Sequence, residues 1–360
     1  MMTHAIRYFG PQWFGTVMGT GALAISLALV SERWDSNRPL EVVSQIFLFL
    51  TIAMFALYIV PWTIRFFKYP TEVNQDINHL IKGQFFPTMP ISLIVIGIAL
   101  AKIGPTMWSV SSLRIPIITL FIAGTVGIFI FGFILVTVMY RSRNVELGHG
   151  VYAWYIPPVS HLIIPVLGFI LIARYYSGTF MGDAIFIVSM ATWGIGFFLF
   201  LFVGSIVYHR YAYGELPLPR VAPTFMIGIA PTAIMTVALV KLAPAINGVS
   251  FGLDSAQVLP VIKLFALAMW GFSVWWFILT FILFFYYLKT MGHPFVFAWW
   301  AYTFPLGAFA ISAGAIGSIM DFPAFWYNLY VVNFLLLFMW IIIVCLTIRL
   351  VWQGKAFMPE

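Results

Sequence analysis

Long apolar runs separated by short polar segments dominate this sequence. Ten of the runs, each roughly 20 to 30 residues long, can cross the hydrocarbon core of a bilayer as α-helices. They lack the period-2 alternation of barrel strands, and lipid offers no partner to free backbone groups, so the runs predict helices. The predicted spans are Gln12–Val30, Glu41–Phe67, Gln84–Ile103, Ile115–Tyr140, Tyr152–Ala173, Asp183–Tyr208, Arg220–Val240, Ala256–Tyr287, Pro294–Gly317 and Phe322–Val351.

Composition supports a membrane protein and excludes a soluble one. Of the 360 residues, 62% are hydrophobic and 8% are charged, against about a quarter charged in soluble domains. The formal charge of +7 comes from scattered Lys and Arg without a basic face, so no nucleic-acid partner is expected. Cys345 is the single cysteine, which excludes an internal disulfide and a cysteine metal site. We therefore predict one all-α integral membrane domain over residues 1–360, with no separate soluble domain.

Lys and Arg are distributed unequally between the two sides of the predicted spans. The side with both termini and the loops after even-numbered spans carries eleven: Arg7, Arg65, Lys68, Lys82, Arg141, Arg143, Arg210, Arg220, Lys289, Arg349 and Lys355. The other side carries six: Arg33, Arg38, Lys102, Arg114, Arg174 and Lys241. Lys263 lies just inside the eighth span and is not counted with them. Because cytoplasmic loops are enriched in Lys and Arg, both termini are predicted to be cytoplasmic.

The odd-numbered spans share interruptions by proline or glycine. The third contains "FFPTMP", the fifth "WYIPPVS", the seventh "VAPTFMIGIAPT" and the ninth "YTFPLG", while the first has glycines in "WFGTVMGTGA". Pro87, Pro157, Pro223 and Pro305 recur about every 70 residues, which indicates a repeated two-helix unit. Interrupted helices are expected to face protein or a water-filled path. We therefore predict five hairpins, with kinked odd helices around a central path and straight even helices against lipid.

Acidic residues avoid the middle of every predicted span. All eleven Asp and Glu lie in loops or at span ends. Proton-driven carriers generally use an intramembrane carboxylate, and cation pathways use carboxylates as binding groups. A path through this protein is therefore expected to carry anions or neutral solutes. Lys102, Arg114, Lys241 and Lys263 at its outer side, together with the more basic inner side, are expected to raise the local anion concentration.

Polar groups within the spans have two interpretations. His161 is the one ionisable side chain near mid-span, and it is either an anion-contacting or proton-sensing group or a neutral histidine bonded to a neighbouring helix. Hydroxyls such as Thr16 and Thr224 either contact a passing anion or bond back to their own helix. Glu146 and His149 in "ELGHG" suggest an intramembrane enzyme, but one such pair is more typical of a solvated helix end.

Phe304 lies beside Pro305 near the middle of the ninth span, in "AWWAYTFPLG". Proline removes a backbone donor, and a hydrophobic constriction can gate a pore by dewetting it. The alternative is an ordinary packing aromatic, since the chain has 37 Phe. Position alone leaves both interpretations open.

Two motifs carry a family resemblance. "PQWFGTVMGTGALA" in the first span and "FAWWAYTFPLG" in the ninth resemble the tellurite-resistance/dicarboxylate transporter family, which includes TehA, the plant slow anion channels, the fungal malate permease and the fungal sulfite efflux pump. The resemblance implies ten helices as five hairpins in quasi-fivefold order around a central pore. It also implies a homotrimer with one pore in each subunit, no bound cofactor or metal, and a pore plugged by Phe304.

The expected function is anion transport across the plasma membrane through a phenylalanine-gated pore. The protein would act as a channel or facilitative transporter for small anions and C4-dicarboxylates such as malate; the alternative is a proton-coupled dicarboxylate carrier or a sulfite exporter, with His161 as relay. The expected gate is Phe304 with Pro305. The pore-lining candidates are Gly15, Thr16, Gly19, Phe86, Pro87, Thr88, Pro157, His161, Pro223, Thr224, Thr303 and Gly307.

Overall fold

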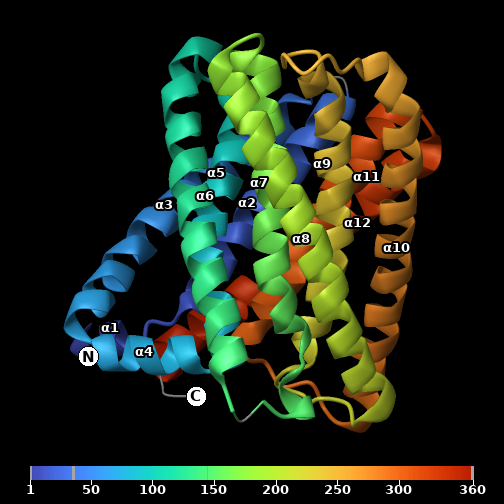
Figure 1. The fold of residues 1–360 in the computed structure, drawn as a ribbon. Coiled ribbons are helices and arrows are strands. Elements are labelled where there is room, and N and C mark those ends of the chain that lie inside the picture. Colours follow the sequence, from blue (N-terminus) through green and yellow to red (C-terminus); the bar gives the residue numbers. More distant parts are fainter. Residues whose placement is uncertain (1, 35–36, 144, 358–360) are drawn as a thin grey trace.

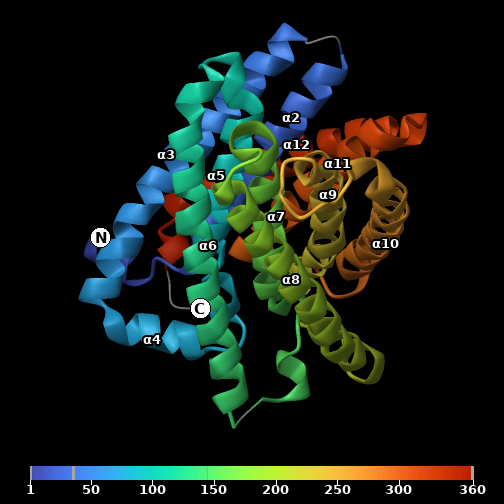
Figure 2. The same ribbon diagram turned by 45° about the horizontal axis from the view of Figure 1, so that its top comes forward.

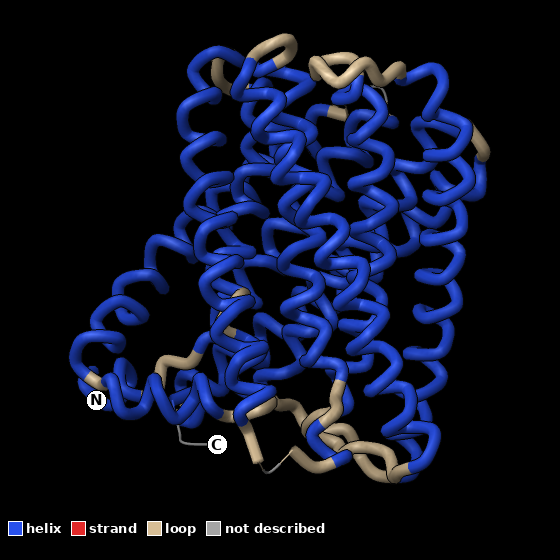
Figure 3. Tube along the Cα trace, viewed as in Figure 1, coloured by secondary structure: helices blue, strands red, loops and turns tan. Residues whose placement is uncertain are grey.

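The apolar runs fold as long helices between two ends where most loops gather (Figures 1 and 3). A computed structural model of the chain describes residues 2–34, 37–143 and 145–357. Within this part, ten helices are long and apolar enough to cross a membrane, and no strand is present. The prediction of an all-α fold with ten membrane helices is confirmed.

The ten helices alternate between shorter and longer elements along the chain. The α-helices of the odd spans are α2 Phe14–Arg33, α5 Thr88–Ile103, α7 Ile156–Leu171, α9 Ala230–Ile246 and α11 Thr303–Met320. Those of the even spans are α3 Arg38–Lys68, α6 Val110–Arg141, α8 Phe180–Tyr213, α10 Ser255–Thr290 and α12 Pro323–Trp352. Two shorter helices, α1 Met2–Arg7 and α4 Pro70–Asn78, were not predicted from the apolar runs.

Burial separates the helices into an inner and an outer layer. In the most apolar stretch of each odd span, 78 to 89% of the residues are buried, whereas the even spans bury 17 to 44%. Figures 1 and 2 show α3, α6, α8, α10 and α12 at the periphery. Their exposed faces carry large apolar side chains, which is the surface a bilayer requires.

Helix contacts close the inner layer into a ring. Each odd helix packs against the even helix that follows it, which gives five hairpins. The inner helices then contact one another in the order α2, α5, α7, α9, α11 and back to α2. A fivefold symmetry of these hairpins stays a prediction.

Pro87, Pro157, Pro223 and Pro305, the prolines predicted to kink the odd spans, lie at the starts of helical segments and not at helix centres. In the ninth span the 3₁₀ segment Phe297–Tyr302 leads directly into α11, so Pro305 is the third residue of that α-helix. First-turn N–H groups have no intrahelical partner, so proline costs no hydrogen bond there. Pro157 lies in the first turn of α7 and Pro87 immediately precedes α5, while Pro223 lies near the start of a 3₁₀ segment. The Phe-Pro pair thus marks the change from 3₁₀ to α geometry.

Small residues allow α2 and α11 to approach closely and complete the ring. A Cβ atom at Gly307 would lie 2.5 Å from the Cβ of Ala22, and a Cβ at Gly19 would overlap the Thr303 hydroxyl. Side chains at these positions would therefore push the two helices apart. Close backbone contact at small residues is a main source of helix association in membranes, where lipid is as apolar as the helices.

Hydroxyl groups join α5 to the start of the first span. Thr88 Oγ1 donates to the Pro11 carbonyl oxygen at 2.8 Å, and Ser92 Oγ donates to the Phe14 carbonyl oxygen at 3.1 Å. Such bonds contribute about 0.6 kcal/mol each in membrane proteins. They also satisfy hydroxyls that lipid would leave without partners.

Both ends of the described chain lie at one end of the bundle, which we call the terminal end. Phe357 stacks on Trp13 with ring centroids 5.3 Å apart, so the segment after α12 returns to the start of the first span. At the same end, Arg65 on α3 forms an ion pair with Asp76 on α4 at 2.5 Å. The opposite end, where α2 finishes at Arg33, is called the mouth end.

Substitution of Gly307 tests the closure of the ring. Gly307→Ala is expected to destabilise the protein by about 1 to 3 kcal/mol, because the new methyl group overpacks the contact with Ala22. The matched control is Gly271→Ala on the outer helix α10, where a Cβ meets nothing within 4 Å. Thermal unfolding in detergent should show a lower midpoint for Gly307→Ala and an unchanged or higher one for the control; equal midpoints would contradict the packing described.

Candidate functional site

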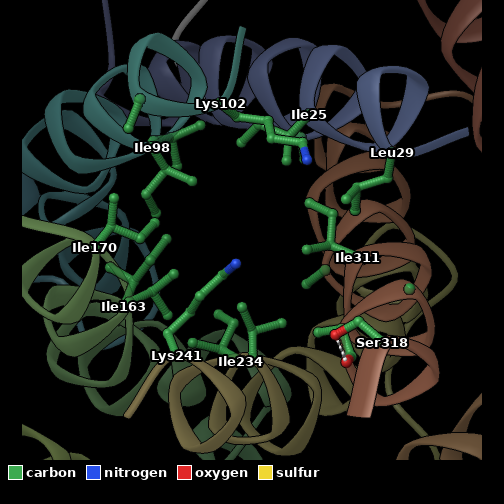
Figure 4. Close-up of a pocket in the computed structure, with 18 of the residues that line it drawn as sticks. Ile25, Leu29, Ile98, Lys102, Ile163, Ile170, Ile234, Lys241, Ile311 and Ser318 are labelled. Carbon is green, nitrogen blue, oxygen red and sulfur yellow. Dashed lines mark hydrogen bonds between the residues drawn. The ribbon is translucent and has the colours of Figure 1, made fainter. Parts of the chain in front are cut away.

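A cavity of about 410 Å³ lies inside the ring of inner helices. All five inner helices line it (Figure 4). Each contributes an isoleucine to the wall: Ile25, Ile98, Ile163, Ile234 and Ile311. The wall is therefore apolar along most of its depth, and it offers a passing solute few hydrogen bonds.

Phe304 is the lining residue of α11 nearest the terminal end. On the same helix the lining extends to Ser318, fourteen residues further, which at 1.5 Å per residue is about 21 Å along the axis. Phe304 is 8% exposed. Most aromatic rings of the inner layer contact another ring, but no ring partner of Phe304 is found within the described ranges of the chain. Its ring borders the cavity instead of an aromatic cluster.

The backbone at Phe304 is held against α2. Thr303 Oγ1 donates to the Trp300 carbonyl oxygen at 2.8 Å, which secures the first turn of α11. Gly19 faces this turn, and a Cβ there would lie 3.5 Å from the Phe304 backbone nitrogen. Gly307 contacts Ala22 one turn further along. These small residues fix the position from which the Phe304 side chain projects.

Aromatic side chains pack the terminal end of the ring. Trp13 lies 4.6 Å from Phe297, between ring centroids, and stacks on Phe9 at 5.5 Å. On the other side of the ring, Tyr152 contacts Phe225 at 5.3 Å. The 3₁₀ segment that carries Phe225 packs against the segments that carry Tyr152 and Phe297. Packed aromatic side chains therefore border the cavity beyond Phe304, toward the terminal end.

Charged side chains gather where the cavity meets the mouth end. The charged lining residues, which we call the mouth cluster, are Glu32, Arg33, Lys102, Arg174 and Lys241. Four of these carry positive charge and one carries negative charge. A narrow apolar recess with a basic rim concentrates anions, because low-dielectric walls focus the field.

Three of the four cations have partners. Lys102 forms an ion pair with Glu32. Arg174 Nη1 donates to the Ala101 carbonyl oxygen. Arg33 lies over the Trp326 ring, 5.1 Å from its centroid. The fourth cation, Lys241, makes no hydrogen bond or ion pair with the described residues, and Figure 4 shows its amine reaching into the cavity.

Of the gate and pore-lining residues predicted from the sequence, Phe304 lines this cavity. The other predicted residues are not among the lining residues. Thr16, Thr88 and Thr224 donate to backbone carbonyl oxygens at 2.7 to 2.8 Å. Phe86 is fully buried against Trp62. Gly19, Thr303 and Gly307 form the α2–α11 contact. Pro87, Pro157, Pro223 and Pro305 start helical segments, and Gly15 is half-buried with open space beside it.

His161 faces an outer helix and not the cavity. Its Nδ1 atom lies 2.8 Å from the Pro157 carbonyl oxygen, one turn earlier on α7. Its ring meets Phe129 of α6 edge-on, with centroids 5.6 Å apart, and a Cβ at Gly132 would lie 2.8 Å from the ring. The cavity wall on α7 is formed by Ile163, Val166 and Ile170. These contacts fit a histidine that packs between α6 and α7.

Glu146 and His149 form a local turn at the terminal end. The Glu146 backbone N–H donates to His149 Nδ1 at 3.0 Å, and the Glu146 side chain is exposed. Glu146 and His149 therefore have the geometry of a solvated loop.

Of the four outer-side cations predicted to attract anions, Lys102 and Lys241 line the cavity, whereas Arg114 and Lys263 do not. The part played by Glu32 and the isoleucines was not predicted from the sequence. Glu32 was placed at a span end, which is correct, but the same position brings it to the rim of the cavity. Membrane helices are apolar on every face, so no periodicity distinguishes Ile234 or Ile311 from their lipid-facing neighbours.

A ring of membrane-spanning helices around a cavity with a basic mouth is typical of a membrane transport protein. Residues 8–348 match the profile of the SLAC1 family, described as a voltage-dependent anion channel. The chain belongs to this family of anion transporters.

Curated relatives cover nearly the whole chain. An uncharacterized transporter of Methanocaldococcus jannaschii is 31% identical over 98% of this chain and 96% of its own length. The malic acid transport protein of Schizosaccharomyces pombe is 23% identical over 97% of this chain and 80% of its own. A sulfite efflux pump of Trichophyton rubrum is 25% identical over 96% and 91%. The family and these relatives are transporters or channels rather than enzymes.

Thiol labelling tests whether the cavity holds water. In a Cys345→Ser background, Ile311→Cys is expected to react quickly with a charged, water-soluble thiol reagent, because residue 311 lines the cavity. Ile316→Cys on the same helix is the control, since Ile316 is fully buried and lies outside the lining. Similar labelling rates at the two positions, measured by mass spectrometry, would exclude a water-filled cavity.

Proposed function

We propose that the protein conducts small anions through the cavity inside its helix ring and that Phe304 is the gate. The observation that carries the proposal is that Phe304 lines a cavity with a basic mouth, at the end of the lining opposite that mouth. The transport unit would be a single chain, because the cavity is enclosed by helices of one subunit.

The chemistry of the cavity supports anions as substrates. Among the lining residues of the described chain, Glu32 is the one carboxylate, and it lies at the mouth with four cations. Deeper in the cavity the wall is apolar, so an anion would meet no charge repulsion and no strong binding group there. Weak binding deep in the path favours passage over retention.

An aromatic side chain between apolar walls is a suitable gate. A narrow apolar constriction loses its water, and an ion cannot cross it without shedding its hydration shell. Phe304 supplies the constriction, and the contacts of Gly19 and Gly307 support the backbone on either side of it. Rotation of one side chain or a small shift of α11 would then open the path. Pro305 contributes by fixing the start of α11 beside the gate.

The substrate range includes small inorganic anions and C4-dicarboxylates such as malate. The relatives named for malic acid transport and sulfite efflux support this range. The protein would act as a channel or facilitative transporter at the plasma membrane. It would assemble as a homotrimer with one pore in each subunit. With both termini in the cytoplasm, as the distribution of Lys and Arg favours, the mouth cluster faces the outside.

Substitution of the gate residue tests the proposal. Phe304→Ala is expected to raise chloride or malate flux in proteoliposomes by at least about tenfold, which corresponds to a barrier lowered by about 1.4 kcal/mol. The control is Phe309→Ala, since Phe309 lies on the same helix but packs against Phe277 of α10 with centroids 5.2 Å apart. Equal flux in wild type and Phe304→Ala would remove Phe304 from the gate.

A pH gradient across the membrane distinguishes uncoupled anion transport from the proton-coupled alternative. His161 faces α6, so an imposed pH gradient is expected to drive no uphill uptake of malate. His161→Gln should leave the flux at each pH within about twofold of wild type, because it removes only a packing group outside the path. Uphill uptake driven by the pH gradient and lost in His161→Gln would establish a coupled carrier.

A further inference from the structure

The mouth of the cavity presents two amines on opposite walls. Lys241 projects from α9 and Lys102 from α5, and these helices are not neighbours in the ring (Figure 4). Lys102 is ion-paired with Glu32, which also lines the mouth of the cavity. Apolar side chains such as Ile98 and Ile234 occupy the wall below the two amines.

The two amines differ in what they already bind. Lys241 makes no ion pair or hydrogen bond with the described residues. Lys102 is bound to the carboxylate of Glu32, whose side chain is 59% exposed, against 24% for Lys102. An ion pair so open to water contributes little net stability, so its carboxylate exchanges readily with another anion. The ion pair with Glu32 thereby shows that the Lys102 amine binds a carboxylate.

We propose that Lys241 is the anion-receiving group of the cavity and that Glu32 controls the valence of the bound anion by occupying Lys102. A monoanion binds at Lys241 alone. A small dicarboxylate binds Lys241 with one carboxylate and replaces Glu32 on Lys102 with the other, while its hydrocarbon body lies against the isoleucine wall. This inference rests on the proposed function, because it assigns a binding step to the same cavity.

The other cations of the mouth cluster are less suited to this role. Arg174 is committed to the Ala101 carbonyl oxygen, and Arg33 lies on the Trp326 ring. A guanidinium held in this way gives up contacts when it turns to a substrate. Lys241 loses none, since it has no partner to release among the residues that the structure describes. Selection between anions thus depends on competition between Glu32 and the substrate for one amine.

Equilibrium binding to the full-length protein in detergent tests the inference without relying on flux. The probes are succinate and butyrate, which share a four-carbon body and differ by one carboxylate. The variants are Lys241→Gln, Lys102→Gln and Glu32→Gln, with Lys241→Arg as a charge-conserving version. The matched control is Lys263→Gln, because Lys263 lies on the outer helix α10 and does not line the cavity.

Each variant has its own expected pattern. Lys241→Gln should weaken the binding of both probes by about tenfold, and Lys241→Arg should retain it. Lys102→Gln should weaken succinate and leave butyrate unchanged. Glu32→Gln should strengthen succinate by several-fold and butyrate far less, a gain that misfolding cannot produce. Lys263→Gln should match wild type.

Two results would overturn the inference. One is unchanged succinate binding in Lys241→Gln. The other is succinate binding in Glu32→Gln that is equal to wild type or weaker. The outcome is independent of the gate: if Phe304→Ala opens the path while these variants bind like wild type, the inference fails alone. If the binding pattern holds but Phe304→Ala leaves the flux unchanged, the gate fails and the binding site stands.

Discussion

The contact between α2 and α11 is the interaction on which the rest of the structure depends. The first and ninth spans are far apart in the sequence, and their contact converts a row of five inner helices into a ring. Gly19 and Gly307 make it possible, because side chains there would collide with Thr303 and Ala22. Lipid supplies no hydrophobic force to bring helices together, so this close packing must hold the ring shut.

Closure of the ring separates two environments inside one apolar bundle. The mouth end is basic and open to water, and the wall below it is lined by isoleucines that hold neither water nor ions strongly. Phe304 lies where this cavity ends, on a backbone that the α2–α11 contact holds in place. The same small residues that close the ring therefore place the aromatic ring at the end of the cavity.

The sequence predicted the ten helices and the inner and outer layers, since apolar length and interruptions by proline or glycine depend on local residues. It predicted prolines as kinks, yet Pro305 starts an α-helix, because a 3₁₀ segment before it can be recognised only from backbone geometry. It left open whether hydroxyls such as Thr16 contact an anion or bond back to their own helix, and the structure shows the bond to a backbone carbonyl oxygen. Helical rotation decides which face meets the cavity, and sequences that are apolar on all sides leave that rotation undefined.

The central claim is that anions pass through the inside of the ring. Anomalous diffraction from crystals of the protein grown in bromide tests it most directly. The account predicts a bromide peak inside the cavity, at the amine of Lys241. Bromide found only on the outer surface or between outer helices, with lipid or packed side chains filling the ring, would contradict it.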